Sequence, residues 1–263
     1  MRFALAVCFC IAFTNWAIAC AIHPVGASDF PKSFVSLDYK KPYPKGIFEA
    51  WFDASTQRYK HGILGDTIEP SSLGVYSDQD RISCGSRVDL DPLHVFEDIA
   101  PRIADITGDG KNEVVVIRSH VKKGAQLSVY AMRFQKLSLI AATPYIGIRH
   151  RWLAPIGIAD FNGDGDMDIA YIDRPHLAQI LRVWSYRDGK LVEIATTSNL
   201  TNHKIGWDFI AGGVRDCGQG PEMITADGAW RKVISTRLID DELHSKEIGV
   251  YSDPDNLKSA LDC

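Results

Sequence analysis

The sequence lacks the excess of positive charge that a nucleic-acid-binding protein needs. Its 29 Lys and Arg residues are outnumbered by 33 Asp and Glu, and the net charge is −4 at pH 7. Because nucleic-acid binding depends on neutralising phosphate groups with Lys and Arg, we expect no nucleic-acid partner. The 263 residues, 46% of them hydrophobic, can instead build the core of one large or two small domains.

The common catalytic signatures are also missing. The chain has no His-Glu-x-x-His motif, no nucleophile elbow, no phosphate-binding loop and no Cys-x-x-Cys pair. Helical periodicity is weak throughout, and the best helix candidate is a short segment near Asp255–Leu261. These absences favour a fold built from strands, with no active site of a familiar type.

Only the N-terminus carries a long apolar run, over residues 3–22 after a single arginine. One positive charge followed by such a run is typical of an export signal. Cleavage after Ala27 would divide the chain into a signal peptide (1–27), an N-terminal extension (28–46) and a repeat domain (47–263). We therefore expect a periplasmic or secreted protein.

Two alternatives to simple secretion stay open. Residues 17–20, Ala-Ile-Ala-Cys, resemble a lipobox, so Cys20 could be lipidated and the protein held at the outer membrane. The apolar run could also stay uncleaved as an anchor, although its length is marginal for a bilayer span. Contact with a membrane is expected only if Cys20 is lipidated.

Cysteine is scarce after the predicted leader. The rest of the chain has Cys84, Cys217 and Cys263. An odd number in an oxidising compartment predicts one bridge and one unpaired thiol. A bridge between Cys84 and Cys263 would tie the chain end to the first repeat, and Cys217 would then be a small buried apolar residue. Connectivity cannot be derived from the sequence, so other pairings stay open.

An internal repeat is the strongest pattern in the chain. Residues 104–116 recur as residues 159–171, 55 positions further on. A degenerate third copy follows at Cys217–Thr225, and an upstream echo, Gly65–Glu69, precedes the first good copy. Four units at this spacing span most of the chain after the leader.

Each unit contains short alternating or β-branched runs separated by turn residues, which predict strands. The predicted strands cover Glu113–Arg118, Leu127–Met132, Leu137–Ala142, Ile156–Ala159, Ile169–Ile172, Ile180–Tyr186, Leu191–Thr196 and Phe209–Val214. The fold class is therefore all-β, a small β-propeller of about four four-stranded blades. Five blades, an array completed by a second chain, and a twisted sandwich are the alternatives. We expect Ile47–Phe52 to close the ring by adding a strand to the last blade.

The second copy of the repeat has the pattern of a calcium loop. Oxygen-bearing side chains stand at positions 1, 3, 5 and 9 (Asp160, Asn162, Asp164 and Asp168), and the carbonyl of Asp166 would supply position 7. Calcium takes six to eight oxygens, and the glycine at position 6 permits the sharp bend. The loop predicts one bound Ca²⁺, with a water-filled Asx-rich turn as the alternative.

The first copy has a weaker set of ligands: Asp105, Thr107, Asp109 and Glu113, with Lys111 at the position that matches Asp166. One ligand is a hydroxyl, and the last acid is moved into the start of the strand. Whether this loop binds a second Ca²⁺ stays open.

The third copy replaces two of these positions. Arg215 stands where the first copy has Asp105, and Cys217 where it has Thr107. We therefore expect no metal ion in the third loop.

These residues resemble a known family. The segment Ala159 to Ala170, and to a lesser degree Ala104 to Val115, resembles the loop motif of the FG-GAP/VCBS repeats found in integrin alpha-chain propellers and many bacterial secreted proteins. Residues 173–177 and 215–222 are similar to exported VCBS-repeat proteins of alphaproteobacteria. Over about residues 60 to 250, the resemblance implies a propeller with calcium in its loops that acts as a binding or adhesion platform.

Several charged and histidine residues could converge on a central funnel, because successive blades place equivalent loops around one axis. We take these as candidate ligand-binding residues: Arg149, Arg151, Asp173, Arg174, His176 and His203. The expected function is a non-catalytic, exported, calcium-binding platform for a protein or carbohydrate partner. A hydrolase or lyase with its site in the funnel is the first alternative, and a lectin-like carbohydrate binder is the second.

Overall fold

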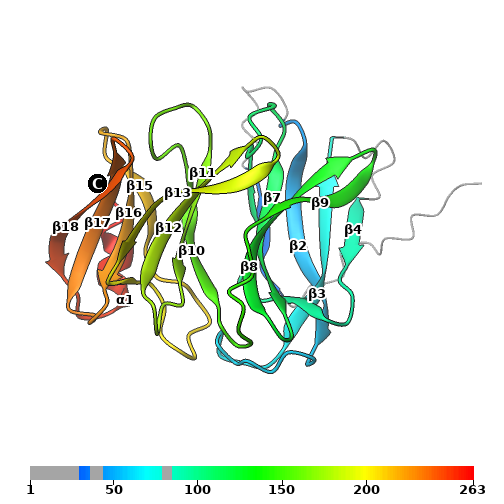
Figure 1. The fold of residues 1–263 in the computed structure, drawn as a ribbon, viewed down its shortest axis with the longest axis horizontal. Coiled ribbons are helices and arrows are strands. Elements are labelled where there is room, and N and C mark those ends of the chain that lie inside the picture. The colour runs from blue at the N-terminus through cyan, green and yellow to red at the C-terminus, as the bar shows by residue number, and fades with distance from the viewer. Residues whose placement is uncertain (1–29, 36–43, 79–84) are drawn as a thin grey trace, which may run out of the picture.

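The computed structural model describes residues 30–35, 44–78 and 85–263, which form eighteen strands and one short helix. The predicted signal peptide, Cys20 and Cys84 lie outside these residues. The strands make four antiparallel sheets that follow one another along the chain. Figure 1 shows the sheets side by side, with the first sheet at one end of the long axis and the last sheet at the other.

The first two sheets occupy the N-terminal half. The first sheet consists of β1 (Lys32–Phe34), β2 (Ile47–Thr56), β3 (Glu69–Ser77) and β4 (Ser86–Asp89). The second sheet consists of β5 (His94–Phe96), β6 (Arg102–Ala104), β7 (Glu113–His120), β8 (Gly124–Arg133) and β9 (Lys136–Ala142). Both β5 and β6 pair with β7, so together they form one interrupted first strand.

The last two sheets repeat this plan. The third sheet consists of β10 (Leu153–Ala159), β11 (Asp168–Asp173), β12 (Ile180–Arg187) and β13 (Lys190–Ser198). The fourth sheet consists of β14 (Leu200–Thr201), β15 (Gly213–Asp216), β16 (Pro221–Asp227), β17 (Lys232–Ile239) and β18 (Glu242–Val250). Here β14 and β15 share β16 as β5 and β6 share β7.

The first strands of the sheets lie around a common hollow. It has a volume of about 340 Å³ and is lined by Ser33 of β1, Arg102 of β6, Ile156 of β10 and residues 209–212 before β15. Ser33 donates from Oγ to the carbonyl of Pro101 at 2.5 Å and so links the first two sheets. Four blades whose first strands face one axis make the fold a small β-propeller, which confirms the prediction.

The predicted closure of the ring is wrong. Residues 47–52 belong to β2, which pairs with β1 and β3 and so stays inside the first blade. Among the described residues, no strand of the first sheet makes extended contact with a strand of the fourth. The link is instead made by the β2–β3 connection, whose Ile63 carbonyl accepts a hydrogen bond from the Gly206 amide at 3.2 Å. Among the described residues, the blades therefore form an arc whose two ends meet through loops and not through a shared strand.

Burial explains why these segments form strands between packed sheets. In β12, Leu181, Val183 and Ser185 are buried while the residues between them are half-buried, as expected for a strand with one face in the core. Every residue of β11 is buried, because sheets cover both of its faces. One large apolar cluster runs through the second, third and fourth blades, and a second cluster joins the first blade to the second.

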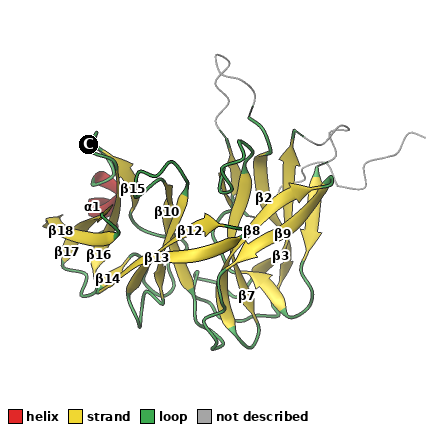
Figure 2. Ribbon diagram, turned by 45° about the horizontal axis from the view of Figure 1, so that its top comes forward, coloured by secondary structure: helices red, strands yellow, loops and turns green. Residues whose placement is uncertain are grey.

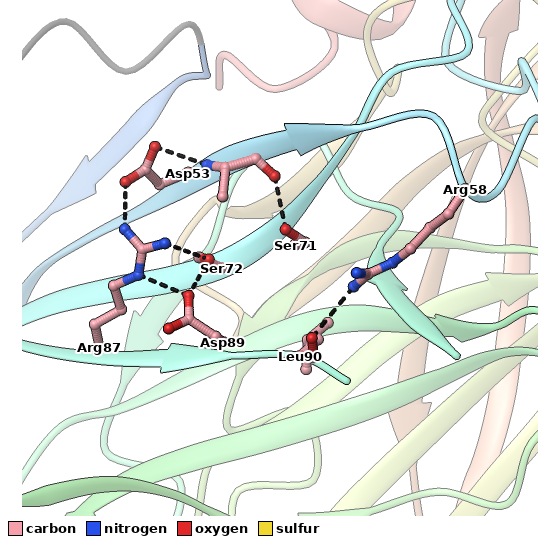
Figure 3. A network of polar contacts seen from close by, with 8 residues as sticks. Asp53, Arg58, Ser71, Ser72, Arg87, Asp89 and Leu90 are labelled. Atoms are coloured by element: carbon pink, nitrogen blue, oxygen red, sulfur yellow. Dashed lines mark hydrogen bonds and ion pairs between the residues drawn. The ribbon is translucent and has the colours of Figure 1, made fainter. Parts of the chain in front are cut away.

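A polar network ties the outer strands of the first blade together (Figure 3). The Arg87 guanidinium on β4 donates to Asp53 on β2, to Ser72 on β3 and to Asp89, all within 2.7–2.8 Å. One side chain thus spans three strands. This network is partly exposed, so it orders the strands more than it adds to the free energy of unfolding.

Two finer predictions need correction. The echo at Gly65–Glu69 lies before β3, in the connection between the second and third strands of its blade, and does not match the loops of the other copies. The predicted strand Phe209–Val214 begins only at Gly213, because residues 209–212 form the loop that turns into the axial hollow.

The C-terminus folds back onto the last blade. Helix α1 (Pro254–Ser259) starts at the capping residue Asp253 and buries Leu257 against Ile224 and Tyr251. Figure 2 shows it as the one helix drawn, beside the last sheet. Among the described residues, no helix has the length and apolar character needed to cross a membrane.

The fold-back brings Cys263 to Cys217, with 5.6 Å between their Cα atoms, and the two form a disulfide. The predicted pairing of Cys84 with Cys263 is therefore wrong. Cys217 is an exposed, bridged residue of the third loop and not a buried apolar one. The cause is α1, which directs the last residues toward the start of β16 and away from the first repeat.

Removing this bridge should destabilise the last blade. In a Cys84→Ser background, Cys263→Ser should lower the free energy of unfolding by up to about 4 kcal/mol, since the bridge closes a long loop with a sequence separation of 46. Urea unfolding followed by circular dichroism measures the loss. Cys217→Ser should give the same value, and equal stability of the bridged protein and both variants would contradict the pairing.

Candidate functional site

The two regions with candidate chemistry lie at opposite ends of the same strands. In the third blade, Ala159 pairs with Asp168 beside the second acidic loop, while Leu153 pairs with Asp173 at the far end of the hairpin. The first, second and third acidic loops join β6 to β7, β10 to β11 and β15 to β16. The predicted funnel residues gather at the other end.

The second loop, residues 160–168, turns around the carboxylate of Asp160. Its Oδ1 accepts the amides of Gly163 and Asp164 at 2.7 and 3.1 Å, and its Oδ2 accepts the Gly165 amide at 2.9 Å. Gly163 and Gly165 have φ values of 76° and 93°, which glycine adopts without strain. These bonds hold the loop in a tight curl.

Asp168 closes this loop from the inside. It is fully buried, its Oδ2 accepts the Phe161 amide at 3.2 Å, and its Oδ1 has no hydrogen-bond partner among the described residues. The pKa of this carboxyl is raised to about 6, chiefly by burial and in part by the nearby Asp164 and Asp160, while the neighbouring Ser185 hydroxyl and the Phe161 amide oppose the rise. A buried carboxylate oxygen without a partner is costly, so this site favours a cation.

The first loop has the same plan. Asp105 accepts the Gly110 amide at 2.8 Å through Oδ2, and its buried Oδ1 has no partner among the described residues. Glu113 takes the place of Asp168 and accepts the amides of Ile106 and Thr107 at 2.9 and 3.1 Å. Burial raises the pKa of Glu113 to about 7. In this loop Lys111 turns its ammonium to Asp109, 3.3 Å away.

In the third loop, an internal cation meets the equivalent acid. Arg215 Nε donates to Glu222 at 2.5 Å, and Ser235 binds the other oxygen of Glu222. Asp216 accepts the amides of Gly218 and Gly220 and so keeps the tight turn. In this loop the guanidinium of Arg215 balances the negative charge of Glu222. In the other two loops, no guanidinium among the described residues pairs with the equivalent acid, Glu113 or Asp168.

The residues of the first two loops fit a calcium ion in their chemistry. The second loop offers three carboxylates, one amide oxygen and one backbone carbonyl within nine residues, which suits a hard cation. No three His, Cys, Asp or Glu side chains in the described part of the chain already converge on one point. Asn162 donates to Asp164 at 2.8 Å, so ion binding requires these two side chains to exchange that bond for the ion.

A cavity of about 300 Å³ opens at the other end of the strands. We call it the histidine cavity. Its lining comes from the connections beside all four blades: His61, Ile63, His150, Arg151, Trp152, Arg174, Pro175, His176, Leu177 and Ile205. Its size is at the lower end of the range for small-molecule sites.

A buried acid positions one wall of the cavity. Glu97, which is fully buried, binds His61 Nδ1 through one oxygen and the Ser119 hydroxyl through the other. The His61 ring stacks on His150 with 4.8 Å between centroids and 6° between planes. Burial raises the pKa of Glu97, and the bond from His61 opposes this rise.

A second histidine pair forms the floor beside Trp152. His176 Nε2 lies 3.0 Å from the His203 carbonyl and 3.2 Å from His203 Nδ1. His203 Nε2 is 3.0 Å from the carbonyl of Trp207. Burial lowers the pKa of His176, and it lowers that of His203 to about 4. Both rings are therefore neutral near pH 7.

The structure places the six predicted ligand-binding residues in different roles. Arg151, Arg174 and His176 line the histidine cavity, and His203 lies beneath it. Arg149 lies outside the lining and donates to His150 Nε2 at 3.1 Å. Asp173 faces a neighbouring hollow, where it accepts from Arg174 at 2.8 Å and from Arg182 at 3.1 Å.

The sequence analysis missed His61, Glu97 and Ser119. They come from three separate segments of the first two blades, and no spacing in the sequence connects them. The one available signal was Glu97 directly after the apolar pair Val95-Phe96, where a charged residue next to a buried strand is unusual.

The fold and its loops define a small β-propeller with acidic turns between the first two strands of successive blades. Residues 105–171, which run from the start of the first acidic loop through the second, match the FG-GAP-like repeat. The chain therefore carries a repeat of the FG-GAP-like family, and such repeats indicate a propeller-type binding or adhesion domain. No curated protein matches the chain.

Breaking the cation–acid pair of the third loop should be costly. Arg215→Met leaves Glu222 partly buried without its cation and should lower the free energy of unfolding by about 2 kcal/mol. Lys232→Met, which breaks the exposed pair with Glu247, is the matched control and should cost much less, because water and salt screen an exposed pair. Similar losses from both variants in urea unfolding would show that Arg215 has no special role.

The buried His203 should make stability depend on pH. Its pKa in the folded state, about 4, lies below the ordinary histidine value of 6.5, so the folded protein binds fewer protons than the unfolded chain between these two pH values. Stability should fall as the pH drops through this window, by up to about 3 kcal/mol. His203→Gln should reduce this fall, whereas His244→Gln, on an exposed position of β18, should leave it unchanged. Parallel curves for all three proteins would contradict the assignment.

Proposed function

We propose that the protein is an exported, calcium-stabilised β-propeller that acts as a non-catalytic binding protein, with the histidine cavity as its ligand site. The observation that carries the calcium assignment is the buried, unpartnered Oδ1 of Asp168 at the inner end of an acidic loop. Asp160, Asn162, Asp164, Asp168 and the carbonyl of Asp166 would hold the ion.

Comparison of the three loops supports this assignment. Each places one acid at the start of the second strand of its blade: Glu113, Asp168 or Glu222. Only the third loop supplies a guanidinium to that acid, through Arg215. A bound Ca²⁺ would supply the missing positive charge in the second loop, and a second ion would do so in the first loop through Asp105, Thr107, Asp109, Glu113 and the carbonyl of Lys111.

Two further features support export and binding. The bridge between Cys217 and Cys263 is of a kind that persists in oxidising compartments, as the predicted leader requires. Among the described residues that line the histidine cavity, histidine is the one side-chain type that can act as a nucleophile or as an acid or base, and no Ser, Thr, Cys, Lys, Asp or Glu stands beside it in the lining. This composition favours binding over a hydrolase or lyase reaction.

A lectin-like function is less well supported. Sugar binding needs an exposed aromatic face, but Trp152 is 2% exposed, and Lys204 places its ammonium 5.5 Å from the ring of Trp207 and 4.6 Å from that of Trp230. The rings best placed for stacking are thus covered by the protein itself.

Calcium should stabilise the protein through the second loop. At 100 times its dissociation constant, an ion that binds only the folded state adds about 2.7 kcal/mol, which thermal unfolding in calcium, magnesium or chelator will detect. Asp164→Ala should lose most of this gain in calcium and lose little in chelator, because its side chain is exposed, bonds to Asn162 and the Asp166 amide within the loop, and meets Arg187 only in an exposed ion pair at 3.5 Å. Thr107→Ala should have a much smaller effect. An equal loss in calcium and in chelator would rule out the metal assignment.

A further inference from the structure

We propose that the histidine cavity binds a small carboxylate that carries a flat apolar body. This inference rests on the proposed function only in taking the cavity as the ligand site. Among the described residues that line the cavity, three are histidines, two are arginines and none is acidic. The two arginines give this lining its positive charge, and the histidines add ring nitrogens that can form hydrogen bonds, so the lining complements a negative charge.

The positive charge at the cavity is not fully neutralised by the protein. Arg174 is paired with Asp173 through two hydrogen bonds of 2.8 and 3.0 Å. Arg151 instead donates to the carbonyl of His150, and Arg149 to its ring, and neither arginine pairs with a carboxylate among the described residues. Guanidinium groups that keep free N–H donors recognise carboxylates, often with two parallel bonds.

The apolar part of the cavity continues to its mouth. Ile63 and Trp152 are buried walls, whereas Leu177 and Ile205 are 64% and 72% exposed at the rim. These two side chains extend the apolar wall of the cavity out to its rim. An apolar body would cover them while its carboxylate meets the arginine side.

His61 supplies a pre-positioned polar contact. Because Glu97 holds Nδ1 and Ser119 holds Glu97, the ring is oriented by a fully buried group, and Nε2 is the nitrogen left for a ligand. Nε2 faces the cavity side of the ring as a hydrogen-bonding group for the ligand, while Nδ1 stays with Glu97. Glu97 is thus a positioning residue and His61 a binding residue.

Isothermal titration calorimetry with phenylacetate, at low ionic strength and in calcium, tests the proposal. Phenylacetate should bind, and phenylacetamide, which has the same shape without the charge, should bind at least about tenfold more weakly. A second arm compares a tripeptide that ends in phenylalanine with its amidated form, because a protein C-terminus presents the same chemistry. Binding of the free peptide but not of phenylacetate would assign the carboxylate to a peptide chain end.

A pair of charge substitutions at the rim localises the site without disturbing the core. Ile205→Glu should weaken phenylacetate binding by about threefold to tenfold, and Ile205→Lys should strengthen it by a similar factor. Phe134→Glu carries the same charge change at the far, fully exposed end of β8 and should have no effect. Arg151→Met should weaken binding by at least about tenfold.

The outcomes separate this proposal from the calcium assignment. Equal binding of phenylacetate and phenylacetamide, or equal effects of Ile205→Glu and Phe134→Glu, would overturn the anion site. So would a lack of binding by phenylacetate and both peptides in a protein whose melting temperature responds to calcium. Binding of phenylacetate by a protein whose melting temperature does not respond to calcium would support the carboxylate site and contradict the calcium assignment.

Discussion

The need to compensate a buried acid shapes the inner loops of this propeller. Glu113, Asp168 and Glu222 each stand at the start of a second strand, where the turn needs an acceptor for backbone amides or a partner for a neighbouring side chain. A carboxylate in such a place is stable only with a positive partner. The third loop has that partner in the chain, as Arg215, and under our proposal an ion would take the same place in the first two loops.

This arrangement separates stability from recognition. The acidic loops close one end of the inner hairpins, and the histidine cavity opens at the other end, so the proposed ion and the proposed ligand would not share side chains. The cavity depends on connections from several blades, and its shape therefore depends on the whole arc of sheets. Balancing the negative charge of the acids in these loops would keep the strands in register and so hold the cavity walls in place.

Much of the fold followed from periodicity, because a repeat of 55 residues with alternating apolar positions permits few architectures. The strands from Glu113 to Thr196, the short C-terminal helix and the blade plan were all predicted. The disulfide, the role of residues 47–52 and the match of Gly65–Glu69 were not, because each depends on where a loop or chain end lies in space. The candidate site was predicted in part. The repeated loop motif pointed to the acidic residues, because they lie close together in the sequence. His61 and Glu97 are 36 positions apart and meet only after two blades have packed.

Among the described residues, the first and last blades meet where the Gly206 amide donates to Ile63 and Gly65 lies against Gly206, and they share no strand pairing. This contact lies beside the histidine cavity, whose lining includes Ile63 and Ile205. A molecule held between His61, Ile63 and Ile205 would bridge chain segments more than 140 residues apart. A ligand bound in the histidine cavity would then slow the separation of the first blade from the last, and the rate of that separation would depend on the ligand.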